Sequence, residues 1–114
     1  MTSDTDYNGW TNKPTWLVKL WIDNDQGSQE HWLFLAREAV LKTRGYGKNA
    51  AQQAQYGLAR VLREAFEDEA ADLNGVAGFF SDLMSWALAM VNWDEVANSL
   101  IEDAAEIKRL ATLD

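Results

Sequence analysis

The spacing of apolar residues restricts the fold of this chain more than any other feature. Between residues 12 and 110 large apolar side chains return every three or four positions, which is the pattern of helices with one buried face. Neither an alternating strand pattern of useful length nor an internal repeat is present, although a short strand around Trp10 stays open. The sequence therefore predicts an all-α fold, a compact single-domain bundle of about five helices.

Capping and turn residues place the helix boundaries. Asn12 precedes a first turn that contains Pro14, where the missing N–H costs nothing. Gly75 follows Asn74 and suits the left-handed position past a helix end. With caps at Asn12, Ser28, Asn49 and Asn92, we expect helices over about residues 12–24, 28–43, 49–74, 79–90 and 92–110.

Length and composition indicate how the chain is organised into domains. A chain of 114 residues suits one domain, and we expect a flexible leader over residues 1–9 and a single helical domain over residues 10–114. Residues 45–47, Gly-Tyr-Gly, form the most flexible-looking interior loop. The helix at 79–90 is apolar nearly all round, so we expect it to be the central helix. Cysteine is absent, so the fold must be held by packing alone, and a cytoplasmic location is expected.

Charge is distributed very unevenly. Residues 1–63 hold six acids and eight bases, whereas residues 64–114 hold twelve acids and only Lys108 and Arg109. Such a field attracts basic partners and repels nucleic acid and anionic lipid. We therefore expect neither direct nucleic-acid binding nor membrane binding.

The acids lie on helix faces. On the third predicted helix four of them fall within about 140°, and on the fifth four more fall within about 120°, each set beside or opposite an apolar face. These eight are the candidate partner-binding residues: Glu64, Glu67, Asp68, Asp72, Asp94, Glu95, Glu102 and Glu106. An ordinary solvated face is the alternative. Glu69 falls in the apolar arc, where an exposed last turn or a buried functional carboxylate would explain it.

The opening of the chain is rich in tryptophan. Trp10, Trp16 and Trp21 lie within twelve residues and suit either core packing or an exposed binding surface. This segment, about residues 7–24, resembles a family of small domains, mostly of unassigned function, from bacteriophages and other mobile elements. The shared signature is Asn-x-x-Thr-Trp-x-Val-x-Leu-Trp, here Asn12, Thr15, Trp16, Val18, Leu20 and Trp21. The resemblance implies a phage-like context and no mechanism.

Catalytic chemistry has little support in the sequence. His31 is the only histidine, and a transition-metal site needs further imidazole or thiolate ligands. Phosphate-loop and calcium-loop patterns are absent, so we expect no enzyme activity, no cofactor and no metal. A basic patch of Arg37, Lys42, Arg44 and Lys48 around Tyr46 is either a solvated loop or a small positive surface.

Two hypotheses about function follow. In the first, a phage or mobile-element protein uses its acidic faces to bind and inhibit a basic, nucleic-acid-handling host defence complex of the restriction or CRISPR kind, by analogy with acidic inhibitors and possible mimicry of nucleic acid. In the second, the chain is a helical interaction or self-assembly module whose tryptophan-rich face or helix at 79–90 packs against another subunit, while its acids confer solubility. The chain is expected to be a monomer or a homodimer.

Overall fold

The computed structural model describes residues 9–74 and 78–111. Its elements are α1 (Lys13–Asn24), α2 (Gln26–Lys42), the 3-10 helix η2 (Arg44–Asn49), α3 (Ala50–Asn74), α4 (Phe79–Ala89) and α5 (Trp93–Ala111). No strand occurs among these residues, Trp10 included. The prediction of an all-α domain with five α-helices is therefore confirmed.

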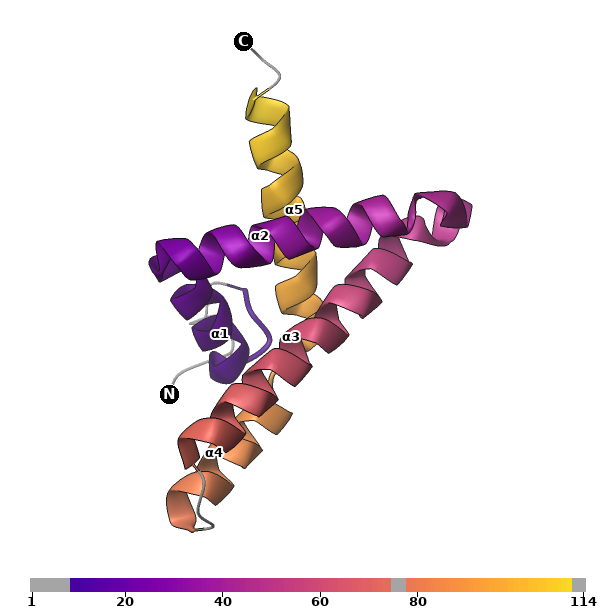
Figure 1. The fold of residues 1–114 in the computed structure, drawn as a ribbon. Helices are drawn as coiled ribbons and strands as arrows, with labels where there is room; N and C mark the ends of the chain where they lie inside the picture. Colours follow the sequence, from indigo (N-terminus) through magenta and orange to yellow (C-terminus); the bar gives the residue numbers. More distant parts are fainter. Residues whose placement is uncertain (1–8, 75–77, 112–114) are drawn as a thin grey trace.

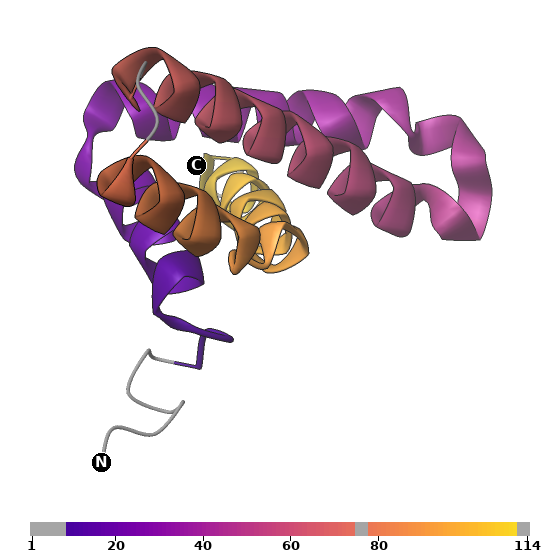
Figure 2. The same cartoon turned by 90° about the horizontal axis from the view of Figure 1, so that it is seen from below.

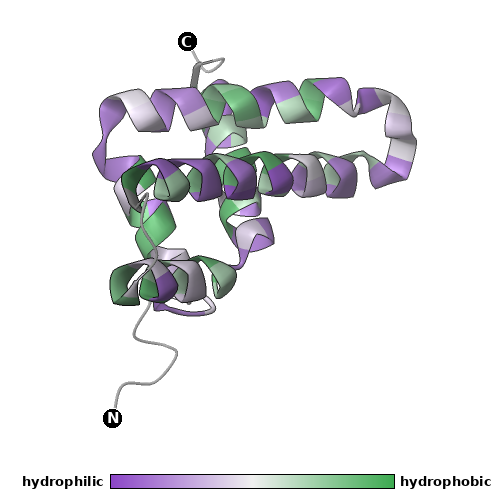
Figure 3. Ribbon diagram, turned by 60° about the horizontal axis from the view of Figure 1, so that its bottom comes forward, coloured by the Kyte–Doolittle hydropathy of each residue, from purple (hydrophilic) through white to green (hydrophobic). Residues whose placement is uncertain are grey.

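The helices are arranged around α5. In Figure 1, α2 and α3 diverge from η2 as the two arms of a V, and α5 passes behind α2. Figure 2 looks nearly along α5, with α2 and α3 above it and α1 and α4 beside it. Hydrophilic and hydrophobic turns alternate along α2 and α3 (Figure 3), as expected of helices with one buried face.

The core is formed by α1, α2, α3, α5 and Val91, which lies between α4 and α5. Its buried apolar members are Val18, Ile22, Trp32, Ala36, Leu58, Ala59, Leu62, Val91, Val96, Ala97 and Leu100. Trp32 stacks on Phe66 at 6.3 Å between ring centroids, and Phe66 contacts Trp93 at 5.6 Å. Trp10 packs against this cluster, whereas Trp21 is 69% exposed. The tryptophan-rich opening is thus partly core and partly surface.

The prediction of a central helix at 79–90 is wrong. None of the residues of α4 is buried, and this helix packs on the C-terminal half of α3 at one end of the molecule (Figure 1). The central position belongs to α5, which contacts α1, α2 and α3. An apolar composition alone did not reveal which faces of the helix would be covered.

Capping at the first and last helices is as predicted. Asn12 Oδ1 accepts the N–H of Thr15 at 3.0 Å, and Asn92 Oδ1 accepts the N–H of Glu95 at 3.1 Å. The segments around these two caps are also hydrogen-bonded to each other. The hydroxyl of Thr15 accepts the N–H of Asn92 at 2.9 Å, and Asn12 Nδ2 donates to the carbonyl of Met90 at 2.7 Å. Asn12 and Thr15 of the signature therefore tie the start of α1 to the start of α5.

Two other boundaries differ from the prediction. The cap of α2 is Asp25 and not Ser28, because Asp25 Oδ2 accepts the N–H of Ser28 at 2.9 Å. Residues 45–47 belong to η2, which Asn49 ends and α3 continues. Gly47 introduces a kink within η2 with φ +63°, in the left-handed region that glycine enters without cost.

Candidate interaction surfaces

A row of large apolar side chains lies on the outside of α4. Phe79, Leu83, Trp86 and Met90 fall within about 60° of one another around the helix axis, and we call them the α4 stripe. All four are exposed, Phe79 by 73% and Trp86 by 60%. The opposite side of α4, with Ser81, Met84, Ser85 and Leu88, lines a shallow hollow against Glu67, Ala70 and Ala71 of α3.

More apolar area adjoins the stripe. Phe80 lies next to Phe79, with 5.2 Å between the ring centroids, and both Phe80 and Leu73 are 75% exposed. Single exposed apolar side chains are ordinary, but a contiguous group of aromatic and aliphatic residues marks an interaction site. The second hypothesis from the sequence named this helix as one possible interface, but the helix was also expected to be central, so the stripe itself was not singled out.

The α3 acidic ridge comprises Glu64, Glu67, Asp68 and Asp72 on the helix that α4 packs against, and Glu67 lines the hollow on the side of α4 opposite the stripe. Glu69 lies on a different side of α3. All five acids are exposed, and none forms an ion pair with another described residue. Exposure of Glu69 agrees with the last-turn explanation and excludes a buried carboxylate. Residues 64–91 contain six acids and no base, so the segment that carries both the ridge and the stripe is strongly acidic.

The predicted ridge on α5 is not a continuous acidic surface. Asp94 lines a hollow with Arg60 and Arg63 of α3. Glu95 is half-buried and accepts the N–H of Thr11 at 3.0 Å. Glu102 is exposed.

Glu106 is also engaged, because it binds Arg109 at 2.7 and 3.1 Å. The Arg109 guanidinium lowers the pKa of Glu106 and has its own pKa raised in return. The acidic half of α3 lies beside α4, whereas the C-terminal half of α5 extends past α2 (Figure 1). The eight predicted partner-binding carboxylates therefore do not form one surface.

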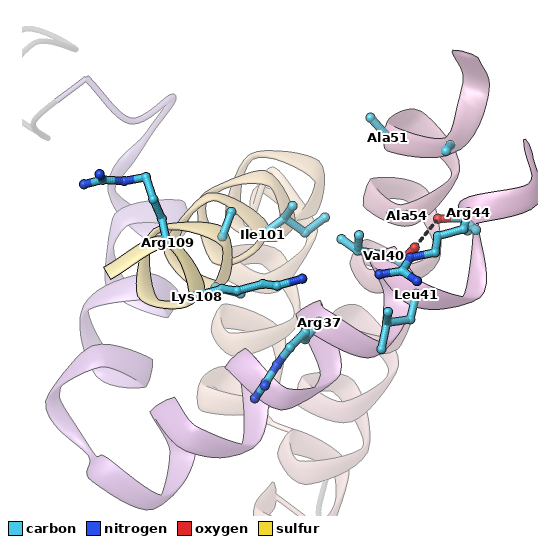
Figure 4. A pocket seen from close by; sticks show the side chains of 13 residues that line it. Arg37, Val40, Leu41, Arg44, Ala51, Ala54, Ile101, Lys108 and Arg109 are labelled. Atoms are coloured by element: carbon cyan, nitrogen blue, oxygen red, sulfur yellow. Dashed lines mark hydrogen bonds between the residues drawn. The ribbon is translucent and has the colours of Figure 1, made fainter. Parts of the chain in front are cut away.

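A basic groove lies between the end of α2, the start of α3 and the C-terminal half of α5. Its volume is about 690 Å³, and we call it the α2–α3–α5 groove. Its apolar lining consists of Val40, Leu41, Ala50, Ala51, Ala54, Ile101, Ala104 and Ala105. Its charged lining consists of Arg37, Arg44, Lys108 and Arg109, with no acid among the lining residues. Lys108 from α5 and Arg44 from η2 extend toward the opening in Figure 4.

The predicted basic patch is thus only partly correct. Arg37 and Arg44 line the groove, while Lys42 lines a separate hollow between α2 and α3. Lys108 and Arg109 were missed, because they lie more than sixty positions further along the chain and only the fold brings them to the groove. Lys48 and Tyr46 are exposed on η2 and do not line it.

Among the charged residues, Lys19 stands out because it is 6% exposed. Its ammonium group donates to Asp23 at 2.7 Å and to Asp103 at 2.8 Å. Burial alone would lower the pKa of Lys19, but the hydrogen bonds to Asp103 and Asp23 outweigh it and raise the pKa above its ordinary value of 10.5. This ion-pair network joins α1 to α5 and is structural.

Other types of site receive little support. His31 is exposed and contacts Trp32 edge to face at 5.0 Å. In residues 9–74 and 78–111, no three His, Asp or Glu side chains come together as metal ligands would. None of the helices described here combines the length and the apolar character that a membrane crossing requires.

Comparison with known proteins identifies a family whose function is unknown. No curated protein and no solved structure matches the chain. One family model matches residues 3–110, and its description is a family of unknown function, DUF7249. Because the match spans nearly the whole chain, including the α4 stripe and the α2–α3–α5 groove, this protein belongs to the DUF7249 family.

Proposed function

We propose that this protein is a helical protein-binding module, and that the α4 stripe with the α3 acidic ridge is its binding surface. The observation that carries the proposal is the exposure of Phe79, Leu83 and Trp86 along one side of α4. Burying such side chains contributes about 1.5–3 kcal/mol each. Aromatic residues of this kind are the usual energetic centre of an interface.

The acidic ridge defines the chemistry of the partner. Residues 64–91, which carry the apolar row and the ridge, contain six acids and no base, and this combination fits an apolar patch or amphipathic helix with Lys or Arg at its edges. The acids increase the association rate and select against acidic partners. The apolar contacts then slow dissociation.

A model peptide tests this proposal. An amphipathic helical peptide of Leu and Lys is titrated into the protein, with a peptide of Leu and Glu in the same order as the control. Binding of the Leu/Lys peptide alone, weakening as salt is raised, is expected.

Two substitutions in the protein separate this surface from general charge attraction. Trp86→Ser removes the centre of the α4 stripe, whereas Trp21→Ser removes a comparably exposed tryptophan from α1. We expect Trp86→Ser to weaken binding at least tenfold and Trp21→Ser to leave it unchanged. If Trp86→Ser left the affinity for the Leu/Lys peptide unchanged, charge attraction alone would explain the binding, and this would contradict the proposal.

The acidic ridge also favours a second candidate, the binding and inhibition of a basic host defence complex. Its support is the five exposed carboxylates of α3, which form no ion pair with described residues. The α5 carboxylates contribute less to this candidate than the sequence suggested. Charge reversal of Glu64, Glu67, Asp68 and Asp72 should abolish the inhibition of such a complex and preserve the fold. Inhibition that persists would exclude the acidic mechanism.

A further inference from the structure

We infer that the partner of the α4 stripe is the α2–α3–α5 groove of a second copy of this chain, so that copies associate head to tail. This inference rests on the proposed function and specifies its partner. The argument combines two surfaces that carry opposite charge and share an apolar centre.

The two surfaces are complementary in chemistry. The α4 stripe presents Phe79, Leu83 and Trp86, and the helix that α4 packs against carries the four exposed carboxylates of the α3 acidic ridge. The groove presents Val40, Leu41 and Ile101 among four basic side chains, and none of its lining residues is acidic. Arg109 keeps its bond to Glu106, which leaves Arg37, Arg44 and Lys108 as the cations to face the ridge.

One copy does not bring its own two surfaces together. The groove is lined by Ala50, Ala51 and Ala54 at the start of α3, and the acidic ridge begins at Glu64. At 1.5 Å per residue, Ala54 and Asp72 are about 27 Å apart along this straight element. Figure 1 shows α4 at the far end of α3 from the junction with η2.

A symmetric pair formed by two α4 stripes is disfavoured. It would place six acids of one copy, with no base among residues 64–91, against the same six acids of the other. Like charges at an interface suppress association. The head-to-tail contact instead places acids against bases, and such a contact uses different surfaces on its two sides, so it continues into larger rings or filaments.

Two variants with one disabled surface each provide the test. Leu83→Ser with Trp86→Ser disables the stripe, and Arg37→Glu with Arg44→Glu disables the groove. All four side chains are exposed, so both variants should fold. Lys13→Glu with Lys48→Glu is the control, because it makes the same change of charge at exposed lysines outside the groove.

Sedimentation is measured over a range of concentrations. The wild-type chain and the control should grow beyond a dimer as concentration rises, and each disabled variant should stay a monomer. An equal mixture of the two variants retains one intact stripe and one intact groove. It should double in mass to a dimer and grow no further.

Charge exchange supplies a second readout. Glu67→Lys with Asp68→Lys, on a chain with an intact stripe, should weaken association with the wild-type groove at least tenfold. When the Glu67→Lys, Asp68→Lys chain is instead mixed with the Arg37→Glu, Arg44→Glu chain, the charges are exchanged and the association should be restored. Absence of rescue would overturn the assigned pairing.

Other outcomes overturn the inference in distinguishable ways. A wild-type chain that stays a monomer at all concentrations, yet binds the Leu/Lys peptide, would refute the second copy and retain the proposed function. Dimers of the groove variant alone would indicate stripe-to-stripe contact. Assembly that appears only after removal of residues 1–8 would assign that segment as the occupant. Assembly of the stripe variant as readily as wild type would refute the head-to-tail pairing, and peptide binding that Trp86→Ser leaves unchanged would in addition refute the proposed function.

Discussion

Lys19 shows how much a single buried charge depends on distant residues. Its side chain is 8% exposed, whereas those of Asp23 and Asp103 are 38% and 46% exposed. Asp23 is one helical turn away and visible in the sequence, but Asp103 lies 84 positions along the chain. Helical spacing can therefore indicate the Asp23 half of this network but not the Asp103 half, and the sequence analysis noted neither. By contrast, the capping roles of Asn12 and Asn92 were predictable, because a cap acts on residues three positions away.

Removing the two acids should cost more stability than removing the lysine. Asp23→Asn with Asp103→Asn leaves a buried ammonium without an anionic partner and should lower the free energy of unfolding by about 1.5–3 kcal/mol. Lys19→Met leaves two acids that water still reaches, so a change within about 1 kcal/mol is expected. Urea denaturation measures both. A larger loss for Lys19→Met than for the double variant would contradict this account of the network.

The raised pKa of Lys19 also sets a pH dependence. A lysine whose pKa is higher in the folded chain than in the unfolded chain stabilises the fold fully below the unfolded value. That contribution disappears as the pH rises through the folded value. The difference in unfolding free energy between wild type and Lys19→Met should therefore stay constant up to about pH 10. Above that pH, the wild type should lose stability relative to Lys19→Met. A difference that changes between pH 6 and 9 instead would assign the effect to another group.

At the level of the helices, periodicity and caps predicted where most elements lie but not how they pack. The helix at 79–90 was recognised, yet its role was reversed, because Phe79 and Trp86 look like core residues in any one-dimensional pattern. Which face is covered depends on the direction in which α4 returns along α3. Residues 75–77, which include the predicted C-terminal glycine Gly75, lie outside the described residues.

Two glycines should respond to alanine with opposite signs. Gly57 lies within α3, where an added Cβ meets no atom within 4 Å, so Gly57→Ala should raise stability by about 0.5–1 kcal/mol. Gly47 also has open space, but its φ of +63° is costly for any L side chain, so Gly47→Ala should lower stability by about 1–2 kcal/mol. Thermal or urea unfolding distinguishes them. Equal effects would contradict the left-handed conformation of Gly47 within η2.

The link between the two helix caps should be worth more than one cap alone. Asn12→Ala removes the bonds that Asn12 Oδ1 accepts from the N–H and the hydroxyl of Thr15, and the bond from Asn12 Nδ2 to the carbonyl of Met90. A loss of about 1–2 kcal/mol is expected from unfolding measurements. Asp25→Ala, which removes only the α2 cap, is the control and should cost less. Equal losses would show that the bonds to the Thr15 hydroxyl and to Met90 contribute nothing.

For the whole molecule, the fold converts a charge imbalance along the chain into two separate surfaces. Residues 64–91 carry the acidic ridge and the apolar row, while bases from residues 37–44 and 108–109 meet around an apolar groove. The net charge of −8 correctly indicated an acidic surface but concealed the basic one. The proposed binding function depends on the apolar residues of α4 being outside the core.

Urea unfolding of the Leu83→Ser, Trp86→Ser variant, at a concentration low enough to keep every chain a monomer, tests that dependence. Exposed positions away from packed contacts change stability by about 0.5 kcal/mol or less, so the variant should unfold almost as the wild type does. Leu100→Ala, at a fully buried position, should lose about 2–5 kcal/mol in the same measurement. A comparable loss for the α4 variant would place the stripe in the core and contradict its role as a binding surface.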